Sequence, residues 1–435
     1  MKWDRSKQMQ ERMNEIIPGG AHTYAKGEDQ YPEALLPIIR RGEGCHVWDV
    51  DGNCYIEYGS GLRAVGLGHA YKPVIEAAAR QMAFGANFVR PAAIELECAE
   101  AFLQMINRAE MVKFGKNGSD ATSAAVRLAR SYTGRDLIGM CAEHPFFSVD
   151  DWFIGTTPVA GGIPQVIRDL AVKFHFNDVE SVRTMFDAYP GKIACLIMEA
   201  EKDHPPDAGF FTAVEALCRK NGAVFILDEM ITGFRWDNGG AQAMYNINPD
   251  LCTFGKAMAN GFCLSALAGK KEIMKLGGLR HDKERVFLMS YTHGAETHSL
   301  AASIATMTVY REEPVVKTLW KQGERLAAGF RKAIAGHHLE GYVEVIGRPC
   351  NMVYATRDEN KQPSQPFRTL FLQETIKRGL LAPSIVVNYS HKDEDIDKTV
   401  AIVDEALAVY RKAIDEGVDK YLVGRPVKPV YRTFN

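Results

Sequence analysis

Two residues in the middle of the chain, Asp228 and Lys256, have the types and the settings that a catalytic pair requires. Residues 223–227 form a short apolar run, typical of a strand buried on both faces of a parallel sheet, and Asp228 follows it directly. A carboxylate at the carboxyl end of such a strand lies where open α/β sheets bind their ligands. Lys256 has uncharged neighbours on both sides, and burial there would favour the neutral, nucleophilic amine.

A lysine and a buried acid in this arrangement suit pyridoxal phosphate, which needs a Schiff-base lysine and an anion that keeps its ring nitrogen protonated. The alternative is a solvated lysine and a helix-capping aspartate, because any α/β chain offers such pairs. The spacing of Asp228 and Lys256 alone leaves both interpretations open.

The order of the surrounding motifs carries more information than the pair itself. The run Asp-Glu-Met-Ile-Thr-Gly-Phe-Arg at 228–235 is followed by Gly-Gly-Ala-Gln at 239–242, Pro-Asp-Leu at 249–251 and Gly-Lys at 255–256. This order resembles the class III (subgroup II) pyridoxal-phosphate-dependent aminotransferases, and within that family the glutamate-1-semialdehyde 2,1-aminomutases. The resemblance implies that Lys256 forms the internal aldimine and that Asp228 pairs with the ring nitrogen. It also implies that Met230 packs on one face of the ring, where relatives carry valine or isoleucine.

A second motif predicts a phosphate site. The strand-like residues 111–114 lead into the turn Gly-Lys-Asn-Gly-Ser-Asp and a helix expected to begin at Ala121. Free backbone N–H groups and the helix dipole make such a turn attractive to anions. A plain N-cap role for the Ser-Asp pair explains the same letters. By the resemblance, Asn117, Gly118 and Ser119 hold the cofactor phosphate.

Three further residues are candidates for contact with the cofactor. Phe146 fits the aromatic ring that relatives stack on it, whereas Phe147 fits a core position. Glu199 ends the apolar strand 193–198, and we expect it to order the site. In the charged loop that follows, His204 would replace the asparagine that contacts the phenolic oxygen in relatives. A loop that is merely solvated surface is an equal alternative.

The segment 290–300 implies a partner subunit. Relatives carry a threonine here that crosses a dimer interface to the neighbouring cofactor phosphate, so the resemblance implies a homodimer with shared active sites. Thr292 takes that role if a two-residue insertion is allowed. Without the insertion Thr297, as a helix cap, is the substitute.

Length and composition indicate an α/β fold of two lobes. The chain has 435 residues, of which 46% are hydrophobic and 24% charged, as in a globular protein. The resemblance implies fold type I, with a mostly parallel central sheet in a large cofactor-binding domain at 71–315. Residues 1–70 would contribute to a smaller α+β domain completed by 316–435. The tail from Gly417 is either an interface arm or surface wrapping.

The composition also argues against several classes of partner. A net charge of −2 with interspersed signs gives no basic stripe for nucleic acid. No long apolar run and no signal peptide is present, so we expect a cytoplasmic protein without a membrane partner. The nine cysteines contain no C-x-x-C pair, so we expect buried, reduced thiols and no metal site.

Three functions compete at this point. The first is transfer of an amino group from an amino acid donor to an aldehyde or keto acceptor, a sugar-derived carbonyl being one candidate. The second is the intramolecular transfer of glutamate-1-semialdehyde 2,1-aminomutase. The third is a non-catalytic protein that binds a phosphorylated ligand. Departures from the aminomutase pattern at 21–27, 146–147, 199–206 and 296–298 favour the first.

Overall fold

The computed structural model describes residues 1–144, 146–201 and 203–433. The chain divides into two compact units, which are described separately. The larger unit contains residues 64–66 and 72–316, and the smaller contains 1–63, 67–71 and 317–435. Across the described ranges, no helix combines the length and apolarity that crossing a membrane requires.

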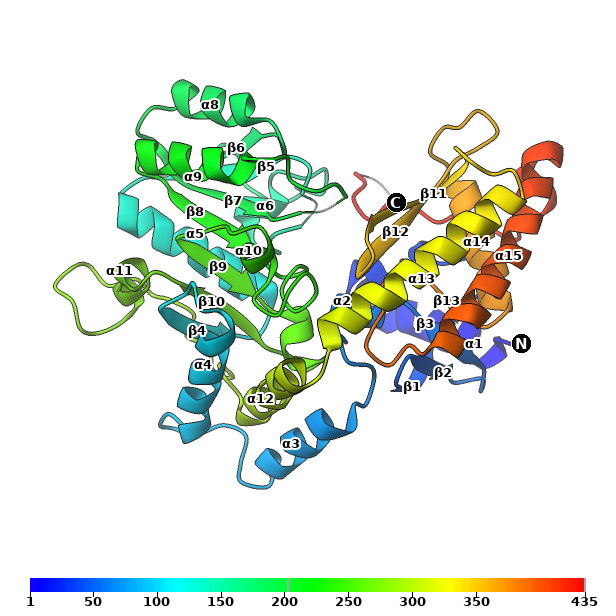
Figure 1. Cartoon of the computed structure of the whole chain (residues 1–435), viewed down its shortest axis with the longest axis horizontal. Coiled ribbons are helices and arrows are strands. Elements are labelled where there is room, and N and C mark those ends of the chain that lie inside the picture. Colours follow the sequence, from blue (N-terminus) through cyan, green and yellow to red (C-terminus); the bar gives the residue numbers. More distant parts are fainter. Residues whose placement is uncertain (145, 202, 434–435) are drawn as a thin grey trace. The chain divides into compact units, whose positions relative to one another are not determined.

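A seven-stranded sheet forms the centre of the larger unit (Figure 1). Its strand order is β4-β10-β9-β8-β7-β5-β6, and the pairs from β9 to β6 are parallel. Only β10 runs antiparallel to both of its neighbours. The strands are β4 (Met111–Gly115), β5 (Leu137–Cys141), β6 (Ala171–Phe174), β7 (Ile193–Glu199), β8 (Val224–Asp228), β9 (Leu251–Phe254) and β10 (Ser265–Gly269). Strands β7 and β8 are buried throughout, as their unbroken apolar runs predict.

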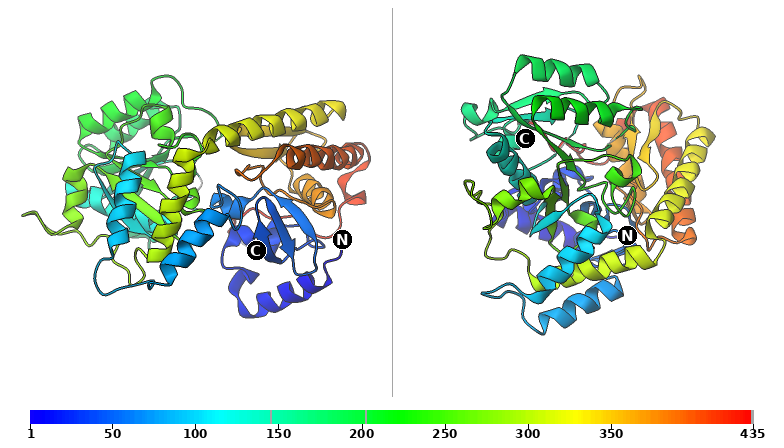
Figure 2. Two further views of the ribbon diagram at one scale, coloured as in Figure 1. Left: turned by 60° about the horizontal axis from the view of Figure 1, so that its bottom comes forward. Right: turned by 60° about the vertical axis from the view of Figure 1, so that its left-hand side comes forward.

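Some helices of the larger unit pack on this sheet, and others pack on one another. Helix α5 (Gly118–Thr133) packs against five strands, from β4 to β7, while α8 (Val179–Ala188) and α9 (Phe210–Asn221) pack on each other and on β6 and β8. Helix α12 (Thr297–Glu312) lies along α3 (Lys72–Met82) and α4 (Ala93–Met105) (Figure 2). Shorter helices are α6 (Asp151–Ile154), α7 (Gln165–Arg168), α10 (Ala241–Met244) and α11 (Lys271–Met274).

The smaller unit combines a four-stranded sheet with long helices. Strands β1 (Ile39–Glu43), β2 (His46–Asp49) and β3 (Cys54–Glu57) form an antiparallel meander, and β13 (Leu380–Leu381) joins β3 in parallel. Strands β11 (Val343–Arg348) and β12 (Asn351–Thr356) form a separate antiparallel hairpin in the same unit. The helices are α1 (Asp4–Ile16), α2 (Ser60–Arg63), α14 (Gln365–Lys377) and α15 (Asp393–Glu416), while α13 (Val315–Gly336) starts at the unit boundary.

The predicted fold class, α/β with a mostly parallel sheet and a second, smaller unit, is confirmed. The predicted start of the phosphate-turn helix is wrong by three residues, because α5 begins at Gly118 and not at Ala121. The carboxylate of Asp120 accepts hydrogen bonds from the N–H groups of Lys116 and Asn117, at 2.9 and 2.8 Å. This reciprocal cap draws Gly118 and Ser119 into the first helical turn.

The C-terminal tail is fastened to the segment 28–33 of the same unit. The N–H of Lys428 donates to the carbonyl of Asp29, and the Gln30 amide donates to the carbonyl of Lys428, both at 2.9 Å. Arg425 donates through Nη2 to the carbonyl of Glu28, also at 2.9 Å. Arg432 forms a 2.7 Å ion pair with Asp29. Within its own unit, the tail therefore wraps the surface that precedes β1.

Deleting residues 421–435 is expected to loosen the segment 21–33. Each lost hydrogen bond is worth about 1 kcal/mol, so local opening should increase by at least about 30-fold. Limited proteolysis with mass mapping would show faster cleavage within 21–33, while cleavage in the loop 278–290 serves as the internal control. Equal cleavage rates in the two proteins would show that the tail does not hold this segment.

Candidate active site

Several strands of the large sheet end at one edge with polar residues. Asp228, the last residue of β8, is the register partner of Glu199 at the end of β7 and of Thr253 on β9. Strand β10 runs the other way, so its first residue, Ser265, pairs with Gly115 at the end of β4. The turn after β4, the acid after β8 and the lysine after β9 therefore share this edge, as ligand sites of open α/β sheets do.

Asp228 is almost fully buried and only partly bonded. Its Oδ1 accepts hydrogen bonds from the N–H of Met230 and from the Thr253 hydroxyl, both at 3.0 Å. Burial raises the pKa of this carboxyl to about 6, although the Lys256 charge and the two hydrogen bonds oppose the rise. Both bonds fall on Oδ1, so among the described residues Oδ2 is left for a further donor. A protonated ring nitrogen is a donor of the required kind.

Lys256 occupies a turn that few side chains adopt. It follows Gly255 at the end of β9 and begins a short 3₁₀ turn, Lys256–Ala259, with a backbone φ of 45°. A non-glycine residue in this left-handed region is strained, and such strain concentrates at functional sites. The surrounding residues Ala257, Met258 and Ala259 are fully buried, which fixes the turn. The Lys256 charge lowers the pKa of Asp228, so the lysine lies within electrostatic range of the acid.

Met230 links the lysine turn to the phosphate turn. A Cβ placed on Gly255 would approach the Met230 sulfur to 2.8 Å, and one placed on Gly118 would approach it to 3.0 Å. The first distance is shorter than real Cβ contacts, and the second is at their tight limit. Glycine at both positions therefore leaves room for Met230 to pass between the two turns. The structure thus brings together Asp228, Met230, Lys256 and Gly118, which the sequence places far apart.

The turn before α5 has the features of an anion cradle. Asn117 occupies the N-cap position, and the N–H groups of Gly118 and Ser119 find no acceptor among the described residues. The Ser119 hydroxyl accepts a hydrogen bond from the N–H of Val149 at 3.0 Å and retains its own proton as a donor. Two free amides and a hydroxyl at the N-terminus of a 16-residue helix fit a phosphate group.

Glu229 organises the loop that follows Asp228. Its Oε1 accepts from the N–H of Gln242 at 2.7 Å, and its Oε2 accepts from the N–H of Ala241 at 2.9 Å and from the Thr232 hydroxyl. Complete burial raises the pKa of Glu229 to about 7, and these hydrogen bonds oppose the rise. The acid is therefore a structural anchor for residues 239–242.

We expect Glu229→Gln to destabilise the protein by about 1–3 kcal/mol, because the new NH₂ group would face a backbone N–H that needs an acceptor. A melting midpoint lower by about 1–3 °C in calorimetry would confirm this. The exposed Glu284→Gln is the matched control. An unchanged midpoint would show that the loop does not depend on this carboxylate.

Glu199 and the aromatic segment lie near the same strand ends. Glu199 is buried, and its N–H donates to Nδ1 of the buried His144 at 2.9 Å. Phe147 belongs to the hydrophobic core, as expected. Phe146 is 44% exposed and makes an edge contact with Phe153, with the ring centroids 5.6 Å apart. An exposed ring can still accept a flat partner, so the stacking role of Phe146 stays a prediction.

Two predicted residues lie on exposed loops. His204 is exposed on the loop after β7, and Thr292 is exposed with its carbonyl accepting from Asn87 at 2.8 Å. Their cofactor roles stay predictions. The expectation that Thr297 caps its helix is wrong, because the N-cap position of α12 is Glu296. The Thr297 hydroxyl instead donates to the carbonyl of Gly85 at 2.7 Å.

Some residues at this edge were not predicted. Glu201 is buried, and its Oε2 accepts from the Trp236 indole at 2.9 Å and from the Tyr245 hydroxyl. Thr253 supports Asp228, and His144 supports Glu199. A polar residue within the otherwise apolar strand β9 was the available signal for Thr253. Its pairing with Asp228 could not be predicted, because the sequence does not give the register of the two strands.

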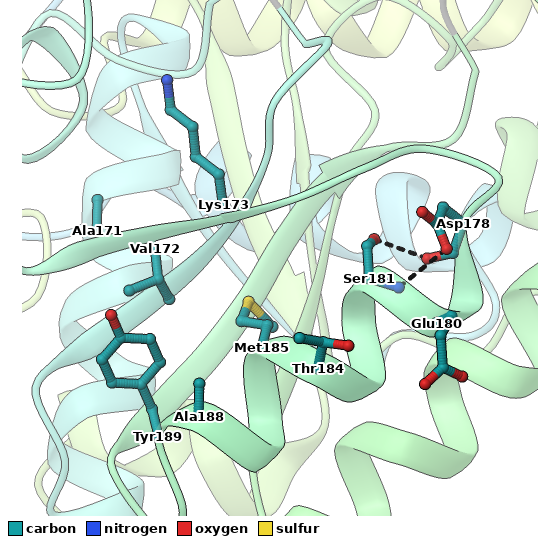
Figure 3. Close-up of a pocket in the computed structure, with 10 residues that line it drawn as sticks. All are labelled: Ala171, Val172, Lys173, Asp178, Glu180, Ser181, Thr184, Met185, Ala188 and Tyr189. Atoms are coloured by element: carbon teal, nitrogen blue, oxygen red, sulfur yellow. Dashed lines mark hydrogen bonds between the residues drawn. The ribbon is translucent and has the colours of Figure 1, made fainter.

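A hollow elsewhere on the larger unit does not belong to this site. It lies between β6 and α8, where Asp178 caps the helix by accepting from the N–H of Ser181 at 2.9 Å (Figure 3). Its lining includes Lys173, Glu180 and Tyr189 and none of the predicted site residues. Strand β6 is the sheet edge, so this hollow is remote in strand order from β8.

Comparison with known proteins agrees with this geometry. The chain matches the class-III aminotransferase family over residues 25–145 and 148–407. It resembles the FumI protein of Sphingopyxis sp. MTA144, solved in its PLP internal aldimine form, with 27% identity, a TM-score of 0.87 and coverage of 95% of this chain and 98% of that chain. An omega-transaminase from Sphaerobacter thermophilus is similar with 24% identity and a TM-score of 0.83, and the match covers 93% of this chain and 97% of that chain. A glutamate-1-semialdehyde-aminomutase from Pseudomonas aeruginosa PAO1 is similar with 19% identity and a TM-score of 0.80, and the match covers 93% of this chain and 94% of that chain.

A fold-type I sheet with an acid, a lysine and an anion cradle at one edge defines a pyridoxal-phosphate enzyme. The match covers most of the chain, so the protein belongs to the class-III aminotransferase family and is a PLP-dependent aminotransferase acting on small molecules. This excludes the reading of a non-catalytic phospholigand-binding protein. The residues present fit the cofactor, because Asp228 offers a buried carboxylate oxygen and the turn of α5 offers free amides.

Proposed function

We propose that Lys256 and Asp228 are the catalytic residues of this aminotransferase. Pyridoxal phosphate, when bound, supplies an aldehyde that condenses with amines and a ring that takes up the electrons released at a substrate carbon. Lys256 would provide the amine that holds the cofactor and, once displaced, would take and return the proton at Cα of the substrate. Asp228 would hold the proton-bearing ring nitrogen. The observation that supports this is a buried acid and a strained lysine at one sheet edge, where the lysine charge lowers the pKa of the acid.

The remaining cofactor contacts are proposed from the same edge. Asn117, Gly118 and Ser119 would hold the phosphate, and Met230 would contact one ring face from its place between the two turns. Phe146 would cover the opposite face. Glu199 would order the phenolic side, with His204 as its proposed partner there.

We also propose that amino transfer is intermolecular, from an amino acid donor to an external aldehyde or ketone. The FumI protein is more similar to this chain in identity and TM-score than the aminomutase is, which supports a branch other than the aminomutases. Incubation with glutamate 1-semialdehyde and no external donor separates the alternatives. Rapid isomerisation would establish the aminomutase reaction, and dependence on a donor amino acid would support the proposal.

The acceptor is proposed to be a polar carbonyl compound, and a sugar-derived aldehyde or ketone is the first class to test. Two acids in the polar segments that suggested this bind within the chain, since Glu296 pairs with Lys116 and Glu201 binds Trp236. The exposed His204 is the polar departure that supports the proposal. Half-reactions with the amine-loaded enzyme and a panel of keto acids, keto sugars and aliphatic aldehydes would rank the classes. Preference for aliphatic aldehydes would refute it.

A homodimer with shared sites is proposed from the position of Thr292. Its exposed side chain is available to a second subunit. Mixing inactive Lys256→Ala with Thr292→Ala should then form heterodimers. One of their two sites would combine Lys256 of the Thr292→Ala chain with Thr292 of the Lys256→Ala chain, so activity should return. Sedimentation would establish the dimer independently. A monomeric, fully active Thr292→Ala protein would refute the shared site.

A further inference from the structure

Three side chains that bind metals elsewhere in proteins meet within the smaller unit. Cys45 and His46 lie at the turn from β1 into β2, and Asp395 lies in the first turn of α15. The Cys45 sulfur is 3.5 Å from Nδ1 of His46, and Nε2 of His46 is 3.3 Å from Oδ1 of Asp395. One donor atom from each residue lies within 4.8 Å of the other two.

The backbone holds these donors in place from both sides. Gly44 has a φ of +57° and exchanges backbone hydrogen bonds with His69, which fixes the turn before Cys45. The carbonyl of Cys45 accepts from the N–H of Glu57 at 2.8 Å. On the other side, Oδ2 of Asp395 accepts from the N–H of Lys392 at 3.0 Å, which directs Oδ1 toward His46. Supporting hydrogen bonds of this kind orient ligands at metal sites.

The donor set favours zinc over harder cations. Calcium and magnesium prefer oxygen ligands, whereas Zn²⁺ accepts thiolate, imidazole and carboxylate together. Tetrahedral ligands around zinc lie about 3.5 Å from one another. The separations of 3.5 and 3.3 Å seen here run to different nitrogens of His46, Nδ1 toward Cys45 and Nε2 toward Asp395. Only one ring nitrogen can bind the ion, so the His46 ring must tilt, because its two nitrogens face different partners.

Access to these donors is asymmetric. The sulfur side is closed, since Cys45 is only 2% exposed, whereas the His46 side chain is 34% exposed. An ion can therefore enter beside the imidazole, and water can complete its coordination.

We propose that Cys45, His46 and Asp395 form a zinc-binding site with three protein ligands and water as the fourth. The site joins the β1–β2 turn to the start of α15, which are distant in sequence. Its role is structural, because it clamps two elements of one unit. The alternative is a hydrogen-bonded chain of thiol, imidazole and carboxylate that binds no ion.

Cobalt(II) is the probe that distinguishes a metal site from such a chain, since tetrahedral cobalt with a thiolate ligand absorbs strongly in the visible. The holoenzyme would be freed of metal with a chelator, titrated with Co²⁺ and then with Zn²⁺. We expect one Co²⁺ per chain, displaced by Zn²⁺, and a higher melting temperature with zinc. His46→Gln should weaken binding by at least about 100-fold, and Cys45→Ser should abolish the visible bands.

A comparable cluster in the other unit provides the matched control. Glu143 there contacts both Cys141, at 3.3 Å, and His175, at 2.6 Å, but in the part of the chain that the structure describes these three do not gather closely enough to share an ion. His175→Gln should leave cobalt binding unchanged. If Cys45→Ser does not fold, His46→Gln decides, because its side chain is partly exposed. Absent visible bands, or binding equal in wild type and His46→Gln, would overturn the proposal.

Discussion

Replacing Lys256 with alanine is expected to reduce transamination by at least about 10⁴-fold. The residue is proposed to supply both the covalent attachment and the proton transfer, and general acid–base catalysis alone contributes about 10²–10⁴-fold. The backbone should tolerate the change, because alanine keeps Cβ and the flanking residues Ala257 to Ala259 remain buried. The measurement is the half-reaction rate with saturating donor, followed by the change in cofactor absorbance.

A covalent assay tests the same prediction without turnover. Borohydride should fix the cofactor to the peptide containing Lys256 in the wild type and to no peptide in Lys256→Ala. The exposed Lys271→Ala is the matched control and should behave like the wild type. Attachment to another lysine, or near-normal activity of Lys256→Ala, would reassign the nucleophile.

The sequence predicted best the features that depend on local pattern. The apolar runs before Asp228 and Glu199 are strands β8 and β7, because a strand buried on both faces needs a continuous apolar run. The turn before α5 was also predictable as a helix start, since glycine and small polar residues are typical of one, but the same residues fit a plain N-cap and an anion site. The first residue of the helix was missed because Asp120 forms a reciprocal cap with the chain before it.

Features that depend on contacts between distant segments were not predictable. The bond from Thr253 to Asp228 requires the register of two parallel strands, which residue periodicity does not encode. The place of Met230 between Gly118 and Gly255 depends on where two turns meet. The cluster of Cys45, His46 and Asp395 joins opposite ends of the chain, so its spacing resembles no metal motif. The tail was left open for the same reason, because its partners lie at 28–33.

Asp228→Asn is expected to have opposite effects on activity and on stability. The amide is isosteric, and its Oδ1 can still accept from Met230 and Thr253. The loss of the anion removes a charge-assisted hydrogen bond to the ring nitrogen, so kcat should fall by about 10²–10³-fold. The exposed Asp282→Asn is the control and should leave kcat unchanged.

The stability effect follows from the raised pKa of Asp228, about 6 against a usual value of 3.8. Between these values the unfolded chain loses the proton while the folded chain keeps it, so Asp228 contributes its full stability below pH 4. That contribution is lost as the pH rises through 6, at a total cost of about 3 kcal/mol. Cofactor-free Asp228→Asn should therefore melt about 3 °C above the wild type at pH 7.5, with the difference shrinking toward pH 5. A variant that is inactive but no more stable at pH 7.5 would show that Lys256 fully compensates the buried charge. The anion would then belong to a matched ion pair and would not be held at a cost for the cofactor.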